Sequence, residues 1–320
     1  MKIELIKQHV NFVLKGTDFK NLGEKKIGKV RDVYTAPDKI TLISTDRHSS
    51  FDRVIAHIPF KGEVLNQISL FWFENTKDIV PNHVISCPDP CVLVAKKCKP
   101  LPIEAIVRGY ITGVTGTSLW THYKAGKRDF GNFVLPEGLK KNQKLDNPVF
   151  TPSTKFEEHD RTLSPQEIVT EGLMTKKMTD EVERIAIALF KRGEEIALKH
   201  GLILVDTKYE FGIDEEGKLL LIDEIHTPDS SRYWKAGSYE ERFNEGEEPE
   251  YFDKEFLRMW FKDNCDPYKD AVLPEAPQEL VVELSRRYIE IYEMLTNKLF
   301  DHDFSQTPLE RVTKNLSGLK

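Results

Sequence analysis

The chain has 320 residues, of which 39% are hydrophobic and 31% charged, and its formal net charge is −6. This length favours two domains over one core, and the composition is that of a globular rather than a disordered protein. The negative charge argues against nucleic acid as a partner, because phosphate-backbone binding needs a basic face. Small anionic ligands need only a local basic pocket and are not excluded.

Neither a membrane span nor a signal peptide is expected. The apolar runs at 202–205 and 219–222 are far too short to cross a bilayer, so no membrane partner is predicted. The N-terminal MKIELIKQHVNFVLKG has no small-residue cleavage site. The four cysteines, at 87, 91, 98 and 265, form no zinc-type pair and are expected to be reduced structural thiols. A cytoplasmic protein is therefore predicted.

The first hundred residues favour β-structure. VRDVYTA at 30–36 and KITLIST at 39–45 have the composition of two strands, and Ala36-Pro37-Asp38 supplies the turn between them. Gly28 stands just before the first of these strands. We expect a β-rich α+β domain over residues 1–104.

Helices and strands alternate in the next part of the chain. Ser164-Pro165-Gln166-Glu167 is a capping box with proline at the first helical position. From Thr179 onward, apolar residues recur at helical spacing until His200-Gly201. We expect a second α+β domain over 105–250, with the glutamate-rich stretch 237–253 as a loop or linker. Apolar spacing over 280–300 predicts a packed helix, within a helical C-terminal region over 251–320.

A hairpin with a charge conflict is predicted around Asp214-Glu215-Glu216-Gly217. If Glu216-Gly217 is a two-residue turn, Glu210 lies directly opposite Asp223, and a four-residue loop leaves them diagonal on the same face. Two facing carboxylates repel each other, and a divalent cation such as Mg²⁺ between them would remove the repulsion. The pattern alone is equally compatible with an exposed acidic hairpin that binds nothing.

Basic residues recur beside small residues in five loops of this acidic chain. Backbone amides of small residues, together with a guanidinium or ammonium group, bind phosphate and carboxylate groups. Five such loops favour a pocket for several anionic groups, such as a nucleotide triphosphate with acidic substrates. The histidines near these loops, His48, His159 and His226, are expected to be ordinary surface groups. The five loops are 28–31, 45–50, 108–118, 151–155 and 229–232.

Six segments together resemble the phosphoribosylaminoimidazole-succinocarboxamide synthetase family of purine biosynthesis. They are GKVRDVY (28–34), STDRHSSFD (44–52), EAIVRGYITG (104–113), FTPSTK (150–155), DTKYEFG (206–212) and DEIHTPDSSRYW (223–234). The resemblance implies that ATP, a carboxyaminoimidazole ribonucleotide and L-aspartate are converted into the succinocarboxamide, ADP and phosphate. It also implies an ATP-grasp-like pair of α+β domains with the nucleotide between them.

The resemblance further implies roles for individual residues. Glu210 and Asp223 match metal ligands for Mg²⁺, and with Lys208 they form the implied catalytic set. ATP is assigned to Gly28, Lys29, Arg31 and Lys208, with adenine held by backbone near 94–99. The ribonucleotide is assigned to Arg108, Asp229 and Arg232, and its imidazole carboxylate to Asp46 and Arg47. Ser153 and Lys155 are the candidates for aspartate.

Two segments depart from the family pattern. Val114-Thr115-Gly116-Thr117 lengthens the loop after the arginine, so the phosphate hydroxyl is assigned to Ser118, with Thr115 and Thr117 as alternatives. After His159-Asp160, many members have an acid and an asparagine where this chain has Arg161-Thr162, which leaves that stretch without an assigned role.

Two other functions compete with the ligase. One is a small-molecule kinase that uses the same nucleotide site, and the other is a non-catalytic nucleotide-binding module. The sequence does not indicate an oligomeric state.

Overall fold

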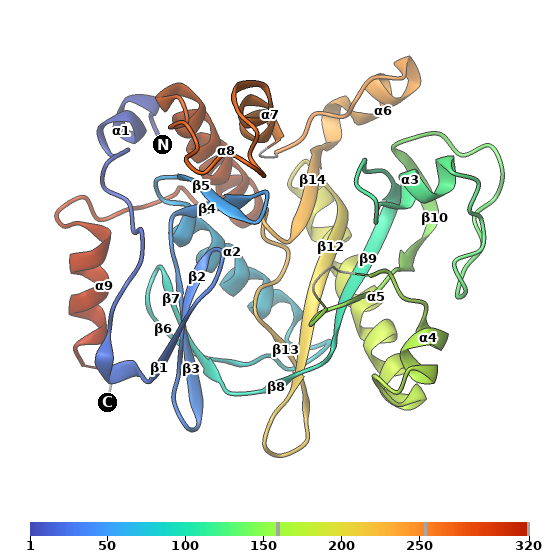
Figure 1. Ribbon diagram of the computed structural model, residues 1–320, viewed down its shortest axis with the longest axis horizontal. Helices are drawn as coiled ribbons and strands as arrows, with labels where there is room; N and C mark the ends of the chain where they lie inside the picture. Colours follow the sequence, from blue (N-terminus) through green and yellow to red (C-terminus); the bar gives the residue numbers. More distant parts are fainter. Residues whose placement is uncertain (158–160, 253–254, 319–320) are drawn as a thin grey trace. The chain divides into compact units, whose positions relative to one another are not determined.

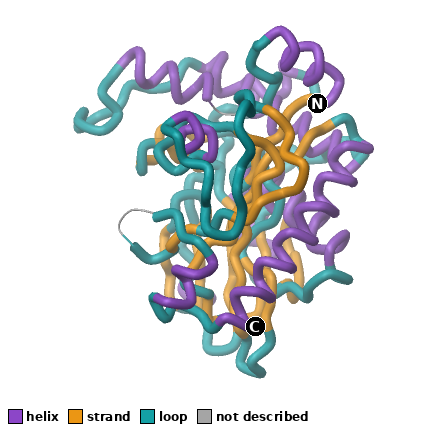
Figure 2. Tube along the Cα trace, turned by 90° about the vertical axis from the view of Figure 1, so that its right-hand side faces the viewer, coloured by secondary structure: helices purple, strands orange, loops and turns teal. Residues whose placement is uncertain are grey.

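The computed structural model describes residues 1–157, 161–252 and 255–318. Two compact units make up the chain. The first contains Met1–Phe71, His83–Lys97 and the described residues from Phe252 onward, and the second contains Trp72–Asn82 and Cys98–Tyr251. Both units combine helices with antiparallel sheets (Figures 1 and 2), which confirms the expected mixed α/β class.

The first unit is built on a five-stranded antiparallel sheet. Its strand order is β1 (Glu24–Ile27), β2 (Arg31–Thr35), β3 (Lys39–Ser44), β7 (Val92–Lys96) and β6 (Val84–Asp89). The two strands predicted at 30–36 and 39–45 are β2 and β3, so this expectation is confirmed. A separate two-stranded sheet pairs β4 (Arg47–Ser50) with β5 (Arg53–His57).

Helices from both ends of the chain pack in this unit. They are α1 (Ile3–Gln8), the 3₁₀ helix η1 (Lys20–Leu22), α2 (Lys61–Thr76), α7 (Glu255–Asn264), α8 (Gln278–Thr296) and α9 (Pro308–Leu316). Helices α1 and α7 pack on α8, and α9 packs on β6. The helix predicted over 280–300 is α8, and it ends at Asn297, which is left-handed.

The C-terminal helix shares the core of the N-terminal sheet. Val312 and Leu316 of α9 are buried in one cluster with Tyr34 of β2 and Ile43 of β3. The described helices after residue 251 therefore belong to the unit of the first sheet. The division into domains at 104 and 250 remains a prediction.

The second unit is built on a seven-stranded sheet centred on one long strand. Along the main path β10 (Gln143–Phe150), β9 (Ile103–Ile111), β12 (Leu202–Ile213) and β13 (Leu219–Ile222) are neighbours. In addition, β11 (Ser153–Thr154) pairs with β9, whereas β8 (Lys99–Pro100) and β14 (Ser231–Lys235) pair with β12. Strand β12 thus contacts most of the others, and its side chains are central to the unit.

A long helix covers one face of this sheet. Helix α5 (Lys176–Lys199) packs against β9, β10 and β12 (Figure 1), and it buries Val182, Leu189 and Phe190. It ends where the periodicity predicted, at His200, and it begins at Lys176, before the predicted Thr179. The capping box at Ser164 is also confirmed, and it opens α4 (Pro165–Thr170). Helix α3 (Leu119–Lys124) is capped by Ser118.

The glutamate-rich stretch was expected to be a loop, and this expectation is wrong for its first half. Helix α6 (Ala236–Glu245) occupies it and ends at Gly246, whose φ is 77°. Tyr239 and Phe243, one turn apart, stack on each other, and Tyr239 also stacks on Trp234. Aromatic packing on one side therefore stabilises a helix whose glutamates are solvated on the other.

The predicted hairpin is present as β12 and β13, but its register is neither of the two expected. Glu210 pairs with Ile222, and Ile213 pairs with Leu219, which leaves a five-residue connection. Asp214 determines this length, because its Oδ1 accepts the backbone N–H groups of Glu216 at 3.1 Å and Lys218 at 2.8 Å. Asp223 consequently lies beyond the last paired residue of β13.

Candidate active site

Three charged side chains meet on three neighbouring strands of the second unit. Arg108 on β9 and Arg232 on β14 each pair with Asp206 on β12. Directly paired residues of antiparallel strands project to the same face of the sheet. The Oδ2 atom of Asp206 lies 3.4 Å from Arg108 Nη1 and 3.0 Å from Arg232 Nη2. The structure thus brings the two predicted anion-binding arginines together around one carboxylate.

The loop after β9 lies beside these arginines. Gly113 has a φ of 97°, and a Cβ there would be 2.5 Å from the Cβ of Ser118 and 3.5 Å from Nη1 of Arg232. Only glycine fits this close approach. The carbonyl of Thr117 accepts a hydrogen bond from Arg108 Nη2 at 3.3 Å. The lengthened loop therefore belongs to the arginine site.

The hydroxyl of Ser118 is engaged within the protein. It donates to Thr121 Oγ1 at 2.7 Å and accepts the Thr121 N–H at 3.3 Å, so it caps α3. Ser118 is buried, whereas Thr115 and Thr117 are exposed. The choice of Ser118 over these threonines as the phosphate hydroxyl remains a prediction.

A second cluster, of lysines and carboxylates, lies further along β12. Lys208 Nζ is 2.7 Å from Glu210 Oε1 and 3.2 Å from Glu104 Oε1. Lys155 forms an ion pair with the other oxygen of Glu210. Ser153 donates to Glu104 Oε2 at 3.5 Å. Ser153 and Lys155, which were predicted for aspartate, therefore lie in one network with Glu210, one of the two predicted metal ligands.

The ammonium of Lys208 is stabilised by three carboxylates. Burial disfavours the charged form, but the carboxylates of Glu210, Asp223 and Glu104 outweigh burial and raise the pKa of Lys208 above its usual range. The lysine is therefore protonated at neutral pH. This interaction also shows that the Asp223 carboxylate acts on the cluster, although it does not face Glu210 across the hairpin.

Asp223 has a left-handed backbone. Its φ is 66°, a region that aspartate and asparagine tolerate better than most residues. Such strained residues often occur at functional sites.

The donor set around Glu210 suits a hard cation shared with a ligand. Within the described residues, no group of three or more His, Cys, Asp or Glu side chains forms a metal site. Magnesium usually takes only one or two protein carboxylates and completes its shell with phosphate oxygens and water. Glu210 and Asp223 carry carboxylate oxygens of this kind, and their role as metal ligands remains a prediction.

Three of the four residues predicted for ATP, Gly28, Lys29 and Arg31, lie in the first unit. Gly28 and Arg31 close the turn between β1 and β2, with the Gly28 N–H 2.8 Å from the Arg31 carbonyl. Lys29 at its tip is exposed and forms an ion pair with Asp52 at 2.6 Å.

Asp46 and Arg47 serve as internal structural groups. Asp46 is 3% exposed and accepts the backbone N–H groups of Leu14 at 2.7 Å and Gly62 at 2.9 Å. Burial raises the pKa of Asp46 to about 7, against the effect of these hydrogen bonds. Arg47 is also buried and donates to Asp32 Oδ1 at 2.8 Å. A role for either residue with the imidazole carboxylate stays a prediction that these contacts do not support.

Asp229 lies in the turn that leads into β14. Its N–H donates to Thr227 Oγ1 at 3.3 Å, and Thr227 in turn donates to Glu224 Oε2 at 2.7 Å. The turn sets the start of β14 and hence the position of Arg232, three residues further along the chain.

The expectation that the loop histidines are surface groups is wrong for two of them. His48 and His226 are both fully buried. His226 Nε2 is 2.5 Å from Tyr209 Oη, its ring makes an edge contact with Trp72, and burial lowers its pKa to about 3. Residue preference for loops cannot reveal such burial. His159 lies outside the described residues.

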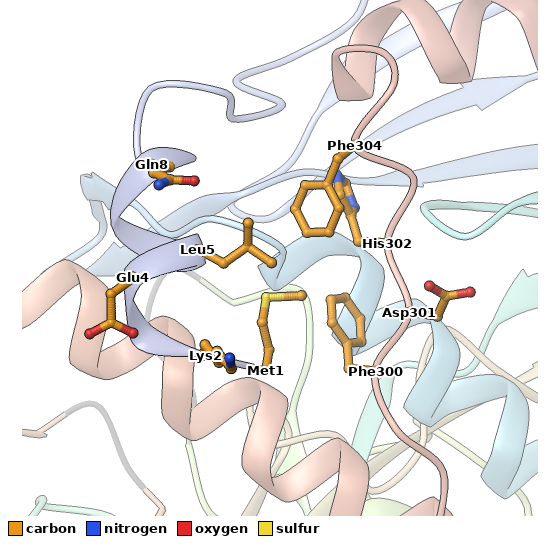
Figure 3. Close-up of a pocket in the computed structure, with 9 residues that line it drawn as sticks. All are labelled: Met1, Lys2, Glu4, Leu5, Gln8, Phe300, Asp301, His302 and Phe304. Carbon is orange, nitrogen blue, oxygen red and sulfur yellow. The ribbon is translucent and has the colours of Figure 1, made fainter.

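A pocket in the first unit lies apart from all these residues. It has a volume of about 410 Å³, and in Figure 3 the side chains of Leu5, Phe300 and Phe304 border it. None of the predicted site residues lines it.

Glu104, Thr151 and Asp206 take part in the site but were not assigned to it from the sequence. Arg108 Nε donates to Thr151 Oγ1 at 2.9 Å. Glu104 stands four residues before Arg108, so the two-residue period of a strand places both side chains on the same face. That period is the signal that could have revealed Glu104, whereas the pairing of Asp206 with both arginines depends on strand order.

The comparisons with known proteins agree on one family. The family described as SAICAR synthetase matches residues 24–275. A phosphoribosylaminoimidazole-succinocarboxamide synthase of Legionella pneumophila (strain Paris) is 58% identical, over 92% of this chain and 95% of its own. A chloroplastic synthase of the same name from Arabidopsis thaliana is also 58% identical, over 91% of this chain and 71% of its own.

Solved structures give the same result. SAICAR synthase from Saccharomyces cerevisiae, complexed with SAICAR, superimposes with a TM-score of 0.77 at 32% identity, over 90% of this chain and 100% of that one. A SAICAR synthetase in complex with ADP gives a TM-score of 0.65 at 25% identity, over 87% of this chain and 100% of that one. The chain therefore belongs to the SAICAR synthetase family.

Proposed function

We propose that this protein is an ATP-dependent, amide-forming ligase of purine biosynthesis. It joins the amine of L-aspartate to the carboxylate of carboxyaminoimidazole ribonucleotide and yields the succinocarboxamide ribonucleotide, ADP and phosphate. The observation that carries the proposal is the 58% identity to a named synthase along 95% of that protein's length.

The chemistry explains why the site needs several cations. A carboxylate is a poor electrophile, so one of its oxygens first attacks the γ-phosphorus of ATP and ADP leaves. The aspartate amine then attacks the acyl carbon, phosphate leaves and the nitrogen loses a proton. Both steps depend on positioning and on neutralising oxygen charge more than on a protein nucleophile.

The arginine site is proposed to bind the phosphate of the ribonucleotide. Two guanidinium groups on one sheet face offer the paired donors that phosphate oxygens accept. Arg108 and Arg232 would make these contacts, with Ser118 and Asp229 at its border. The shared contact with Asp206 and the adjacent loop support this assignment.

The lysine and carboxylate cluster is proposed as the place of phosphoryl transfer. Glu210 and Asp223 would hold Mg²⁺, which when bound supplies positive charge to the phosphate oxygens. Lys208 would neutralise the nucleotide. Gly28, Lys29 and Arg31 are proposed for ATP on the motif resemblance alone.

Ser153 and Lys155 are proposed to bind aspartate. Support comes from the ion pair of Lys155 with Glu210, because an ammonium beside the phosphoryl site can receive a substrate carboxylate there. Asp46 and Arg47 are retained as candidates for the imidazole carboxylate on the motif resemblance alone. The same resemblance is the basis for an ATP-grasp-like architecture, which a crystal structure with bound nucleotide would test.

One assay tests the function. Release of ADP should require the ribonucleotide and aspartate together, and it should stop when Mg²⁺ is chelated and resume when Mg²⁺ is restored. ADP release that needs no aspartate would instead indicate a kinase, and nucleotide binding without turnover would indicate a binding module. The comparisons give no support to the kinase.

A cytoplasmic location is proposed on the state of the cysteines. All four carry thiols and not disulfide bonds, which is typical of a reducing compartment. None of the helices in the described parts of the chain combines the length and apolarity that a bilayer crossing requires. Fractionation of cells that express the protein tests the location.

A further inference from the structure

The arginine site contains an electrostatic conflict that one residue resolves. The guanidinium groups of Arg108 and Arg232 both contact a single oxygen, Oδ2 of Asp206. Without a shared anion, two like charges this close would repel each other. All three side chains lie within the second unit, on adjacent strands.

The two arginines differ in how firmly the protein holds them. Arg108 is 7% exposed, and besides Asp206 it donates to Thr151 Oγ1 and to the Thr117 carbonyl. The Arg232 side chain is 34% exposed. Among the described residues, Asp206 is the acid with which it forms an ion pair. Asp206 therefore does more to orient the side chain of Arg232 than that of Arg108.

The same carboxylate stabilises the charged form of the buried Arg108 guanidinium. Burial lowers the pKa of Arg108, and the neighbouring Arg232 adds to that effect, whereas Asp206 opposes both.

We propose that Asp206 is a positioning residue that holds Arg108 and Arg232 side by side, so that the pair can bind the phosphate monoester of the ribonucleotide. This inference rests on the proposed function. Asp206 does not contact the reacting atoms in this role, and it acts through the two guanidinium groups.

Net charge and positioning predict opposite effects on phosphate binding when Asp206 is neutralised. Asp206 cancels one of the two positive charges, so its neutralisation raises the net positive charge of the site. If charge alone decided, Asp206→Asn would strengthen phosphate binding. If the carboxylate positions the arginines, the same variant must weaken it, because two unrestrained guanidinium groups lose their common orientation.

The experiment measures steady-state kinetics of the full-length protein for each substrate. In Asp206→Asn we expect the KM for the ribonucleotide to rise by about tenfold or more, with the KM values for ATP and aspartate within about twofold. Asp206→Glu keeps the charge but moves the oxygen, so it should also raise the ribonucleotide KM. Asp146→Asn, an exposed substitution on β10, is the matched control and should change none of these values.

A double-mutant cycle tests whether Asp206 acts through Arg232. The ribonucleotide KM of the double variant Asp206→Asn, Arg232→Ala should exceed that of Arg232→Ala by no more than about twofold. Independent, multiplicative effects would overturn the proposal.

Failure of this inference can be told apart from failure of the proposed function. If the unaltered protein needs both the ribonucleotide and aspartate to release ADP, the function stands. An unchanged or lowered ribonucleotide KM in folded Asp206→Asn would then reject the positioning role alone. A variant that changes the Mg²⁺ requirement but leaves the ribonucleotide KM unaltered would also reject it. If Asp206→Asn does not fold, Asp206→Glu provides the test. A ribonucleotide KM in Asp206→Glu equal to that of the unaltered protein would reject the positioning role.

Discussion

The ammonium of Lys208 lies between carboxylates of two neighbouring strands, Glu104 on β9 and Glu210 on β12. This arrangement keeps two acids on one sheet face. The facing pair that the sequence predicted for the hairpin, Glu210 and Asp223, is not formed, because Glu210 pairs with Ile222. The acid that shares Lys208 with Glu210 is instead Glu104 on another strand. A bound nucleotide with its cation would compete with these ion pairs for the same oxygens.

The substitution Asp223→Asn tests the role of the Asp223 carboxylate while the backbone conformation is kept. In Asp223→Asn we expect kcat to fall by about 10²- to 10³-fold, because the variant loses a negatively charged oxygen ligand at the phosphoryl site. Folding should be retained, since asparagine tolerates the φ of 66° at this position. Circular dichroism establishes folding, and ADP release measures kcat. A folded variant with the kcat of the unaltered protein would remove Asp223 from the catalytic set.

Among the helices, α5 depends on a glycine where it crosses β12. A Cβ on Gly193 would be 2.5 Å from Cε1 of His226 and 2.6 Å from Cδ2 of Leu204. Gly193→Ala should destabilise the protein by about 1–3 kcal/mol through overpacking, which exceeds the gain of about 1 kcal/mol in helix propensity. Urea unfolding measures the change.

The control for this substitution is Gly237→Ala in α6. A Cβ at Gly237 has no neighbour within 4 Å, so only the helix propensity changes and stability should stay level or rise. Equal effects of the two substitutions would show that α5 does not approach the sheet this closely.

The last helix, α9, is held by a buried ion cluster. Arg311 lies 2.5 Å from Glu63 Oε1 and 3.0 Å from Asp89 Oδ2, and all three side chains are buried. Arg311→Met should cost about 3–5 kcal/mol of stability, because it leaves two carboxylates buried without their cation. Lys314→Met, at an exposed position on the same helix, is the control and should have little effect. A small loss in Arg311→Met would mean that α9 is not docked on the first sheet.

For the molecule as a whole, two buried groups give opposite pH dependences. The pKa of Asp46 is raised from 3.8 to about 7, so its contribution to stability is full below pH 3.8 and is lost as the pH rises toward 7. The pKa of His226 is lowered from 6.5 to about 3, so its contribution is present above pH 6.5 and is lost as the pH falls toward 3.

Between pH 5 and pH 7 each group changes the unfolding free energy by about 2 kcal/mol, and the two changes nearly cancel. Relative to the unaltered protein, Asp46→Asn should gain about 2 kcal/mol on going from pH 5 to pH 7, and His226→Gln should lose about as much. Urea unfolding of the three proteins at both pH values is the measurement. Parallel pH profiles for all three would show that neither group is buried as described.

Much of the fold could be predicted from local patterns. The strands β2 and β3, the capped helix α4 and the periodic helices α5 and α8 follow from residue preferences and spacing over short windows. Helix α6 could not be predicted in this way, because it is stabilised by stacking on Trp234 in another element. Glutamate is itself a good helix former, so the composition of this stretch did not exclude a helix.

The sequence by itself determined the family, through six ordered segments, and the existence of the β12–β13 hairpin. Only the tertiary structure decided that Glu210 pairs with Ile222, that His226 is buried, and that Asp206 joins Arg108 to Arg232. The physical reason is that side-chain periodicity is a local property of the chain. Strand order, register and burial depend on residues about a hundred positions apart, such as Arg108 and Asp206, and no local pattern specifies them.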